Sequence, residues 1–484
     1  MHSIMKSKLL FSCLVCMSTQ VLLAQNFVEA SPPPPFAEVN AGSVAFADID
    51  GDADQEVLIT GEENAVGRST RLYTNDGGGN FTEVTGIPFE DVWFSSVAFA
   101  DVDGDSDQDV LITGLGPVGP LSKLYINDGN GVFSEVMGTP FEGVQASSVA
   151  FADVDGDADQ DVLITGQNSS GLRIAKLYTN DGSGNFSLDT AQPFKGAGSS
   201  SIAFADVDGD SDPDVLITGQ NSSGGANAPG DPTAMLYLND GGGSFSIMAN
   251  TPFEGVVSSS VAFADVDGDS DRDVLITGFD DSSLESTKLY TNDGSGNFAV
   301  VANTPFEGVG SSSVAFADVD GDSDQDVFIT GGIFGGAISK LYLNDGGGTF
   351  TEMMGTPFEG VAASSIALSD VDGDSDLDIL ITGQRYSAGM ISKLYLNEGA
   401  TAGLGNVDEG SIAVSPNPAT GWMRVQSVQA SIESVALFDL TGRRLPAKIS
   451  HDRHEAQVRS SYRGLALIKV QTDQGVWVQK LRME

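Results

Sequence analysis

The chain has 484 residues, of which 68 are Asp or Glu and 23 are Lys or Arg, so its formal net charge at pH 7 is −45. A surface this acidic repels phosphate groups, which argues against nucleic acid and anionic membranes as partners. The three histidines, His2, His451 and His454, lie near the two ends. A His-based catalytic triad and His-ligated zinc are therefore excluded from the long acidic region between them.

The N-terminus predicts an export signal over residues 1–24. A positively charged start precedes a mostly apolar stretch, Leu9–Leu23, and Ala24 precedes the expected cleavage point. This stretch is short for a membrane span, and no later segment is apolar enough to form one. The only two cysteines, Cys13 and Cys16, lie within the signal. The mature protein is therefore expected to leave the cytoplasm and to rely on metal ions instead of disulfides.

One nine-residue phrase, Asp-x-Asp-Gly-Asp-x-Asp-x-Asp/Glu, occurs seven times in the acidic region. Its copies start at Asp48, Asp101, Asp153, Asp206, Asp265, Asp318 and Asp370. A repeat of this length, roughly fifty residues, predicts an array or a propeller. Alternating carboxylates in a short loop are hard oxygen ligands of the kind that Ca²⁺ prefers. The sequence therefore predicts a series of similar units, each with one calcium ion.

The second repeat illustrates how one unit is built. Ser95–Ala100 alternates between apolar and small polar residues and predicts a strand, which the acidic loop follows. Val110–Thr113 is a continuous apolar strand, and Lys123–Ile126 predicts a third strand. Asn127–Gly129 is a strong turn signal before a fourth strand, Phe133–Val136. Four short antiparallel strands per unit are typical of a propeller blade.

The two ends of the repeat array are complementary. The seventh unit has three predicted strands, ending at Leu394–Asn397, but no fourth. Phe27–Glu29 precedes the first acidic loop in the same way as Phe81–Val84 precedes the second. An N-terminal strand that completed the last blade would close the ring and remove both sheet edges. We therefore predict an all-β fold, with a seven-bladed β-propeller over residues 25–399 that carries calcium-binding loops, followed by a small C-terminal β-sandwich domain.

The acidic loops and the repeated Leu-Tyr-x-Asn-Asp-Gly phrase resemble the FG-GAP/VCBS repeat family, known from the integrin α-subunit propeller and from secreted bacterial proteins. The resemblance covers roughly residues 26–399. It implies that side chains at loop positions 1, 3, 5 and 9, with the backbone carbonyl of position 7, hold about seven structural Ca²⁺ ions. The residues at these positions are Asp48, Asp50, Asp52, Asp54 and Glu56; Asp101, Asp103, Asp105, Asp107 and Asp109; Asp153, Asp155, Asp157, Asp159 and Asp161; Asp206, Asp208, Asp210, Asp212 and Asp214; Asp265, Asp267, Asp269, Asp271 and Asp273; Asp318, Asp320, Asp322, Asp324 and Asp326; Asp370, Asp372, Asp374, Asp376 and Asp378.

Two features depart from the family pattern. Position 6 carries Ala or Ser, as at Ala53 and Ser106, where the family usually has Gly, and a side chain there costs backbone strain. Position 7 is uniformly Asp, a negative charge that the family does not require. An EF-hand loop is excluded, because its position 12 needs Glu and here it holds Ile59 or Ile112 within an apolar strand. Metal-free acidic turns stay open as an alternative, although five carboxylates in nine residues would repel one another.

The order of the strands assigns the loops to two faces. The acidic loops and the Asn-Asp-Gly turns share one face, while the second-to-third-strand loops and the Pro-Phe-Glu-Gly connections share the other. Variation between repeats concentrates on this second face, where a glycan or protein ligand is expected. The candidate contacts are Trp93 and Phe94 for stacking on sugars, with Arg173, Arg385 and Tyr386. The alternative is ordinary loop variation, with the aromatic rings packed between blades.

The repeat ends before residues 400–410, which are expected to form a linker to a separate small β domain over residues 411–484. Three phrases of this domain, Ser415–Ala419, Leu437–Arg443 and the closing hairpin Gly464–Leu481, resemble the C-terminal sorting domain of the type IX secretion system. The resemblance implies that type IX machinery exports the protein across the outer membrane of a Gram-negative bacterium. It also implies a secreted or outer-membrane-surface location, usually with removal of the domain. An immunoglobulin-like accessory domain is the alternative.

Catalytic chemistry has little support in the sequence. A pair of carboxylates, as in glycosidases, is possible in principle. However, most acidic residues belong to the metal loops, and a further set recurs at equivalent places, which suggests an architectural role. This set is Glu90, Glu142, Glu254, Glu307 and Glu359. No catalytic or cofactor-binding residue is therefore expected, and the protein is not expected to be an enzyme.

The C-terminal histidines are a separate candidate. His451 and His454, with Asp452 and Glu455, could form a metal cluster, but a solvated loop is favoured. The sequence thus favours a secreted or cell-surface, calcium-stabilised module for binding or adhesion to glycans or proteins. An extracellular polysaccharide-degrading enzyme on a propeller scaffold and a purely structural surface component stay open, because the fold does not choose among them.

Overall fold

The computed structural model describes residues 26–64, 66–222, 225 and 230–399, together with parts of the C-terminal region: 412–415, 422–427, 431–438, 444–445, 447–451, 454–460, 462–472 and 475–483. The expected signal, residues 1–24, and the expected linker, residues 400–410, lie outside these ranges. Asn26–Gly399 forms one compact unit, and the C-terminal strands belong to another. The described residues contain only strands, turns and loops, so none of them lies in a helix able to cross a membrane.

The second repeat forms a four-stranded antiparallel unit, as its sequence predicts. Its strands are β7 (Trp93–Ala100), β8 (Asp109–Gly116), β9 (Gly119–Asn127) and β10 (Phe133–Glu135), paired in that order. The apolar core of β8 is fully buried, as the continuous apolar run predicts. Strand β7 begins two residues earlier than predicted and contains a register shift between Trp93 and Ser96. Such a bulge sets two residues of one strand opposite a single residue of its partner.

The other repeats use the same order. The first repeat contains β2 (Val39–Asn40) and β3 (Val44–Ala47), then β4 (Glu56–Glu63), β5 (Gly67–Thr74) and β6 (Thr82–Glu83). The third contains β11 (Val144–Ala152), β12 (Asp161–Asn168), β13 (Arg173–Asn180) and β14 (Phe186–Leu188); the fourth contains β15 (Gly198–Ala205), β16 (Asp214–Gln220), β17 (Pro232–Asn239) and β18 (Phe245–Ile247); and the fifth contains β19 (Val257–Ala264), β20 (Asp273–Phe279), β21 (Glu285–Asn292) and β22 (Phe298–Val300). The sixth contains β23 (Gly310–Ala317), β24 (Asp326–Ile333), β25 (Gly336–Asn344) and β26 (Phe350–Glu352), and the seventh contains β27 (Ala362–Ser369), β28 (Asp378–Arg385) and β29 (Gly389–Asn397).

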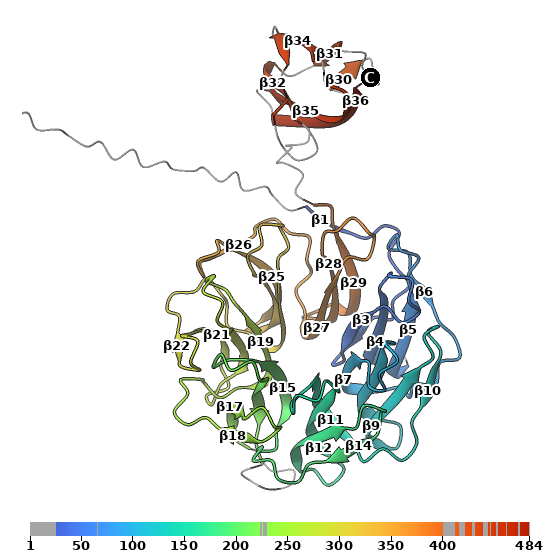
Figure 1. Ribbon diagram of the computed structural model, residues 1–484, viewed down its shortest axis with the longest axis vertical. Helices are drawn as coiled ribbons and strands as arrows, with labels where there is room; N and C mark the ends of the chain where they lie inside the picture. The colour runs from blue at the N-terminus through green and yellow to red at the C-terminus, as the bar shows by residue number, and fades with distance from the viewer. Residues whose placement is uncertain are drawn as a thin grey trace, which may run out of the picture. The chain divides into compact units, whose positions relative to one another are not determined.

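The N-terminal strand completes the seventh unit, as predicted. β1 (Phe27–Glu29) pairs with β29, and Phe27 lies opposite Asn397. Figure 1 shows the resulting ring of blade-like sheets, with the blue start of the chain beside the brown seventh unit. The predicted all-β propeller fold is therefore confirmed.

Neighbouring units pack through a repeated aromatic cluster. In the second unit, the ring of Phe89 lies 4.8 Å from Tyr125 and 5.1 Å from Phe133, between ring centroids. The Tyr125 hydroxyl accepts a hydrogen bond from the backbone N–H of Glu90 at 3.4 Å. The Phe–Tyr–Phe arrangement recurs in the following units, for example with Phe141 and Tyr178. Aromatic pairs of this kind stabilise beyond the area they bury, so each connection is fixed onto the next blade.

The C-terminal unit contains two antiparallel sheets. One pairs β30 (Ile412–Ser415), β31 (Trp422–Ser427), β34 (Glu455–Arg459) and β33 (Lys448–His451), and the other pairs β32 (Ile432–Phe438), β35 (Gly464–Thr472) and β36 (Gly475–Met483). Its core includes Met423, Val458 and Ile468, all fully buried. The expected solvated loop around the histidines is wrong in part, because His451 ends β33 and Glu455 begins β34.

Candidate metal centres

Each acidic loop is held in shape by its own carboxylates. In the second loop, the two oxygens of Asp101 accept hydrogen bonds from the backbone N–H groups of Gly104 (2.8 Å) and Ser106 (2.9 Å). Asp105 accepts one from the N–H of Asp107 at 3.0 Å. Ser106 has φ of 77°, and its counterparts in the other six loops have similar values. Position 6 is therefore left-handed in all seven loops, with Ala or Ser in a conformation that favours Gly, which agrees with the backbone strain expected there.

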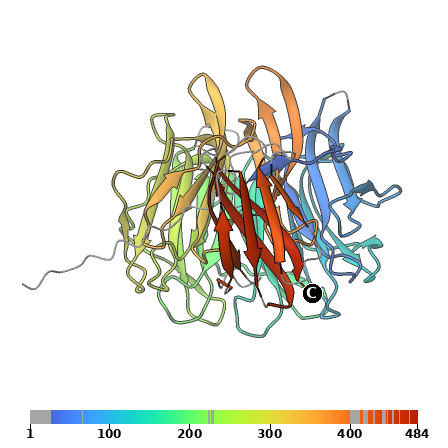
Figure 2. The same ribbon diagram turned by 90° about the horizontal axis from the view of Figure 1, so that it is seen from above.

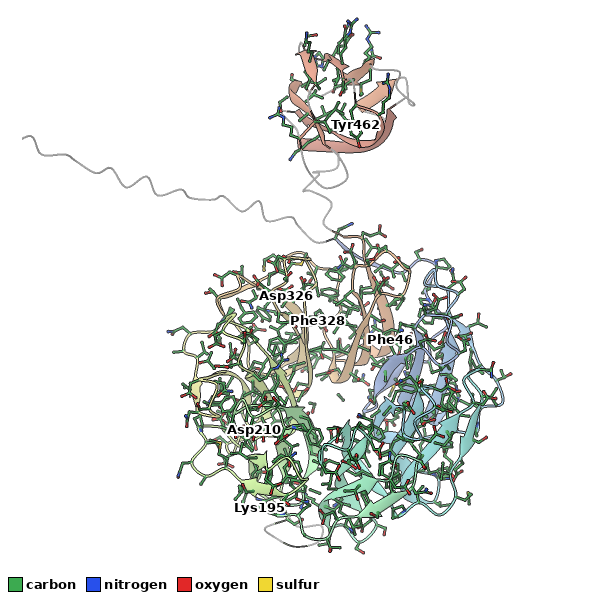
Figure 3. The ribbon with its side chains drawn as sticks, viewed as in Figure 1. Phe46, Lys195, Asp210, Asp326, Phe328 and Tyr462 are labelled. Carbon is green, nitrogen blue, oxygen red and sulfur yellow. The ribbon has the colours of Figure 1, made fainter. Side chains whose placement is uncertain are left out.

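The acid at position 9 is buried and joins the loop to the end of the third strand. Asp109 is 1% exposed, and its carboxylate accepts hydrogen bonds from the N–H groups of Val102 (3.0 Å) and Asn127 (2.8 Å). Burial raises the pKa of Asp109 to about 7, against the opposing effect of these two bonds. Asp326 occupies the same position in the sixth loop (Figure 3), and burial raises its pKa to about 7 as well.

The acid at position 3 has an oxygen without a partner. In six of the seven loops, Oδ1 of this aspartate is buried and receives no hydrogen bond within the described structure. These residues are Asp103, Asp155, Asp208, Asp267, Asp320 and Asp372. Burial and the neighbouring Asp105 carboxylate raise the pKa of Asp103. A buried acceptor without a donor is costly, so the same oxygen in six equivalent loops fits a cation as its partner.

The loops gather these carboxylates into compact groups. In the first three loops, one oxygen from each of positions 1, 3 and 9 lies within 4.8 Å of the others, as for Asp101, Asp103 and Asp109. In the fourth and fifth loops, positions 1, 3 and 5 form the group, including Asp210 (Figure 3). Such a set contains only oxygen donors, which suits a hard divalent cation. The clusters could therefore hold metal ions.

The uniform aspartate at position 7 has a different environment. Asp107 lies against Gly129 of the Asn-Asp-Gly turn in its own unit. A Cβ atom placed on that glycine, which has φ of 74°, would lie 2.3 Å from a carboxylate oxygen of Asp107. The turn therefore needs glycine both for its conformation and for the space that the position 7 side chain occupies.

The acidic loops also join neighbouring units. The side-chain amide of Asn127, in the second unit, donates to the backbone carbonyl of Ile49 in the first loop at 2.7 Å. Asn75 makes the same bond to Val371 at 2.8 Å, which joins the first unit to the seventh. The five remaining junctions carry the equivalent bond, from Asn180, Asn239, Asn292, Asn344 and Asn397. The expectation that acidic loops and Asn-Asp-Gly turns share a face is confirmed.

The hairpins between second and third strands form the opposite face. Figure 2 shows the β24–β25 and β28–β29 hairpins, in yellow and orange, extending to one side of the ring. Trp93 and Phe94 lie at the start of β7, with ring centroids 5.1 Å apart. The Arg68 guanidinium carbon lies 5.5 Å from the Trp93 ring centroid, and Arg68 Nε donates to the Leu115 carbonyl. Trp93 thus packs against a neighbouring unit, whereas Phe94 is 46% exposed.

The other candidate residues of this face are not brought together. Arg385 forms an ion pair with Glu359 (2.9 Å) and donates to the Ala388 carbonyl, so its guanidinium group is already engaged within its own unit. Arg173 bonds to the Gln220 side chain, so it is also engaged by neighbouring groups. Tyr386 is 70% exposed at the tip of its hairpin. Among the predicted contacts, Phe94 and Tyr386 present the most accessible aromatic surface.

The repeated glutamates form ion pairs with lysines of the third strands. The pairs are Glu90–Lys123, Glu142–Lys176, Glu254–Lys288, Glu307–Lys340 and Glu359–Lys393. In the fourth unit, Lys195 replaces the glutamate and Met235 replaces the lysine. The two changes occur together, so the charges at these sites act as partners. This supports the architectural role predicted for the glutamates.

The C-terminal acid and histidine group lies at the turn between β33, which ends at His451, and β34, which begins at Glu455. The carboxylate of Glu455 forms an ion pair with Arg424, with 2.7 Å between Oε1 and Nε. His454 is exposed between β33 and β34, and Asp452 lies outside the described residues.

Comparisons with known proteins address the repeats directly. A family model described as FG-GAP-like repeat matches residues 48–112, 157–217 and 265–329, each of which begins in or at an acidic loop. The chain carries FG-GAP-like repeats. A comparison with curated proteins found no match.

Several solved structures resemble the chain at low identity. AofleA from Arthrobotrys oligospora is 12% identical, with a TM-score of 0.40 over 68% of this chain and 88% of that chain. A variant of the Aleuria aurantia lectin in complex with alpha-methyl-L-fucoside is 11% identical, with a TM-score of 0.36 over 65% and 99%. The β-fructofuranosidase of Aspergillus kawachii complexed with glycerol is 11% identical, with a TM-score of 0.30 over 96% and 90%. These TM-scores are below 0.5 and carry no functional argument.

Proposed function

We propose that this protein is a secreted or cell-surface β-propeller, stabilised by calcium, that acts as a binding or adhesion module for glycans or proteins. The observation that carries the calcium assignment is the buried, unpartnered Oδ1 of the position 3 aspartates in six of the acidic loops. The adjacent carboxylates supply only oxygen ligands, and the loops are already folded around them. Calcium would supply the positive charge that this arrangement lacks.

The assignment of ligands follows the loop geometry. In the second repeat, Asp101, Asp103, Asp105 and Asp109 would hold the ion through side chains, and Asp107 through its backbone carbonyl. Asp101, Asp105 and Asp109 are pre-oriented by backbone N–H groups. Because these carboxylates are already held in position, little conformational entropy is lost when the ion binds.

The binding assignment rests on the difference between the two faces. The acidic loops repeat the same residues in each unit and are engaged in joining the units, which supports a structural role. The hairpin face varies between units and carries exposed aromatic side chains, such as Phe94 and Tyr386. Exposed aromatic groups are enriched in recognition surfaces because they provide large contact area at low entropic cost. Export by type IX machinery through the C-terminal β unit is part of the same proposal, on the strength of its sequence resemblance.

A binding screen tests this function. The full chain, in millimolar calcium and again in EGTA, is incubated with an array of polysaccharides, glycans and matrix proteins. Calcium-dependent binding to one ligand class is expected, with weaker binding by a Tyr386→Ala variant if the contact lies at the hairpin tips. A folded protein that binds no member of any class would contradict the proposal and favour the structural alternative.

A further inference from the structure

The inner strands line an open cavity of about 210 Å³ at the hairpin end of the propeller axis. Each unit contributes two consecutive residues to its lining, such as Phe94 and Ser95, from the bulge at the start of its inner strand. The register places this bulge beside the hairpin, because Trp93 pairs with Leu115 near the end of β8. The cavity therefore belongs to the face on which a ligand is expected.

One side of the lining is apolar. The first of the two bulge residues is alanine in the seventh, first and third units, Ala363, Ala41 and Ala146, and phenylalanine in the second, Phe94. These four units are consecutive around the closed ring, because β1 joins the seventh unit to the start of the chain. Phe94 keeps 46% of its surface exposed, so one aromatic ring is available beside three methyl groups.

The other side of the lining carries hydroxyl groups. In the fourth, fifth and sixth units, the same bulge position holds Ser199, Ser258 and Ser311. The equivalent residues of all seven units share nearly the same φ, between 45° and 48°, so the backbone geometry repeats and only the side chain differs. The lining of the cavity thus has an apolar half and a half that carries hydroxyl groups.

The second bulge residues provide hydrogen-bond acceptors. Thr113 Oγ1 donates to the backbone carbonyl of Ser96 at 3.2 Å, so the hydroxyl of Ser147, 2.9 Å from Thr113 Oγ1, must be the donor in that pair. Having donated its proton, this serine oxygen can only accept from a group in the cavity. The same arrangement holds for six serines: Ser95, Ser147, Ser200, Ser259, Ser312 and Ser364.

We propose that this cavity binds one neutral monosaccharide unit at the end of a glycan. The Phe94 ring would stack on the C–H face of the sugar, while the serine hydroxyls exchange hydrogen bonds with its hydroxyl groups. The volume is below the range of about 300–1,000 Å³ typical of pockets that enclose drug-sized ligands, which suits a single ring. No charged side chain of the described structure lines the cavity, and the protein is strongly acidic, so sugars that carry a carboxylate are disfavoured.

This inference rests on the proposed binding function and assigns its site and ligand class. Saturation-transfer NMR with the full chain in millimolar calcium tests it. The probes are methyl glycosides of glucose, galactose, mannose, fucose and N-acetylglucosamine, with glucuronic acid and sialic acid as charged comparisons. Binding of at least one neutral probe is expected, and an NMR titration gives its affinity.

Two matched variants locate the site. Phe94→Ala should weaken binding about tenfold by removing the stacking surface. It is expected to fold, because alanine already occupies the equivalent position at Ala41, Ala146 and Ala363 with the same φ. Its affinity is followed by NMR titration. Phe334→Ala removes an aromatic ring that is 97% exposed outside the cavity lining, and should leave the affinity unchanged.

The outcomes separate the site from the proposed function. Binding of neutral sugars that is lost in Phe94→Ala and kept in Phe334→Ala supports the site. If the folded chain binds no neutral monosaccharide, prefers the charged sugars, or binds equally well after Phe94→Ala, the site assignment is overturned. A glycan or protein found on the array in those cases would leave the binding function standing at another site.

Discussion

The aspartate at position 3, in six of the seven loops, carries the strongest argument for a cation. Asp103 is surrounded by other carboxylates, yet its Oδ1 is buried without a donor. The loop satisfies Asp101 and Asp105 with its own N–H groups, so it does not lack donors in general. It leaves without a donor the Oδ1 of Asp103, a residue that belongs to the same carboxylate group as Asp101 and Asp109.

Replacing this residue should remove one ion and no more. Asp103→Asn is expected to lower the calcium stoichiometry by one, measured by isothermal titration of chelator-treated protein. If free calcium is ten times the dissociation constant, the lost site costs about 1.4 kcal/mol of unfolding free energy. In EGTA the variant should be as stable as the parent or more stable, because a buried unpaired charge is gone. An equal loss of stability with and without calcium would contradict this role.

The position 7 aspartate offers the matched control. Asp107→Asn changes the same charge in the same loop, but its side chain faces Gly129 and not the ligand cluster. The calcium stoichiometry should therefore stay that of the parent protein. A drop equal to that of Asp103→Asn would mean that the position 7 side chain is itself a ligand.

The spacing of the carboxylates was enough to predict which residues gather in the loops, because a nine-residue turn brings its odd positions together. It could not predict the support at position 9. Asp109 is held by the N–H of Asn127, eighteen residues further along the chain. That contact exists only once the third strand has paired, so local sequence carries no signal for it.

At the level of the strand and turn, the Asn-Asp-Gly segment has two functions. The backbone N–H of Asn180 donates to the position 9 acid of its own loop, Asp161, at 2.8 Å. Its side chain donates to the Val102 carbonyl in the preceding loop, also at 2.8 Å. Calcium bound in one loop would therefore stabilise the junction with the next unit as well.

Loss of this asparagine should weaken a junction. Asn180→Ala removes a buried hydrogen bond to the Val102 carbonyl, which keeps its bond from the backbone N–H of Gly184 (2.9 Å), so the expected cost is about 0.5–1.5 kcal/mol. Urea unfolding followed by circular dichroism measures the change. Asn185→Ala in the same turn removes only exposed bonds to Asp181 and should cost less than about 0.5 kcal/mol. Equal effects of the two substitutions would show that the junction bond contributes nothing specific.

The strand pattern was largely predictable, and its exceptions have physical causes. Alternation in Ser95–Ala100 and the apolar run Val110–Thr113 are strong local signals, and both segments are strands. The bulge at Phe94 was not predicted, because its residues resemble an ordinary strand and the register shift depends on pairing with β8. Strands β33 and β34 were missed because they are short and polar; they pair with each other, and β34 also pairs with β31.

For the whole propeller, closure depends on three residues at the start of the described chain. Phe27 is 5% exposed and lies 5.1 Å from Phe358, between ring centroids, while Glu29 pairs with Lys393 at 2.9 Å. Without this strand, β29 would present an unpaired edge, which favours association with other chains.

Deleting residues 26–30 tests the closure. The loss of the Phe27 burial alone is expected to cost about 2 kcal/mol or more, and the exposed edge should produce oligomers in size-exclusion chromatography with light scattering. Glu29→Gln serves as the control, because it removes only a partly exposed ion pair, worth less than about 1 kcal/mol. A monomeric deletion variant with parental stability would mean that the ring does not need its N-terminal strand.

The calcium account is tested most directly by thermal unfolding of the full chain in millimolar calcium and in excess EGTA. At about 1.4 kcal/mol per ion, seven ions would contribute about 10 kcal/mol, comparable with the whole stability of a typical domain. We predict a large fall in the midpoint of the main transition in EGTA, with cooperative loss of β structure and recovery when calcium is restored. A midpoint that is the same in both solutions would contradict the account and leave the acidic loops as metal-free turns.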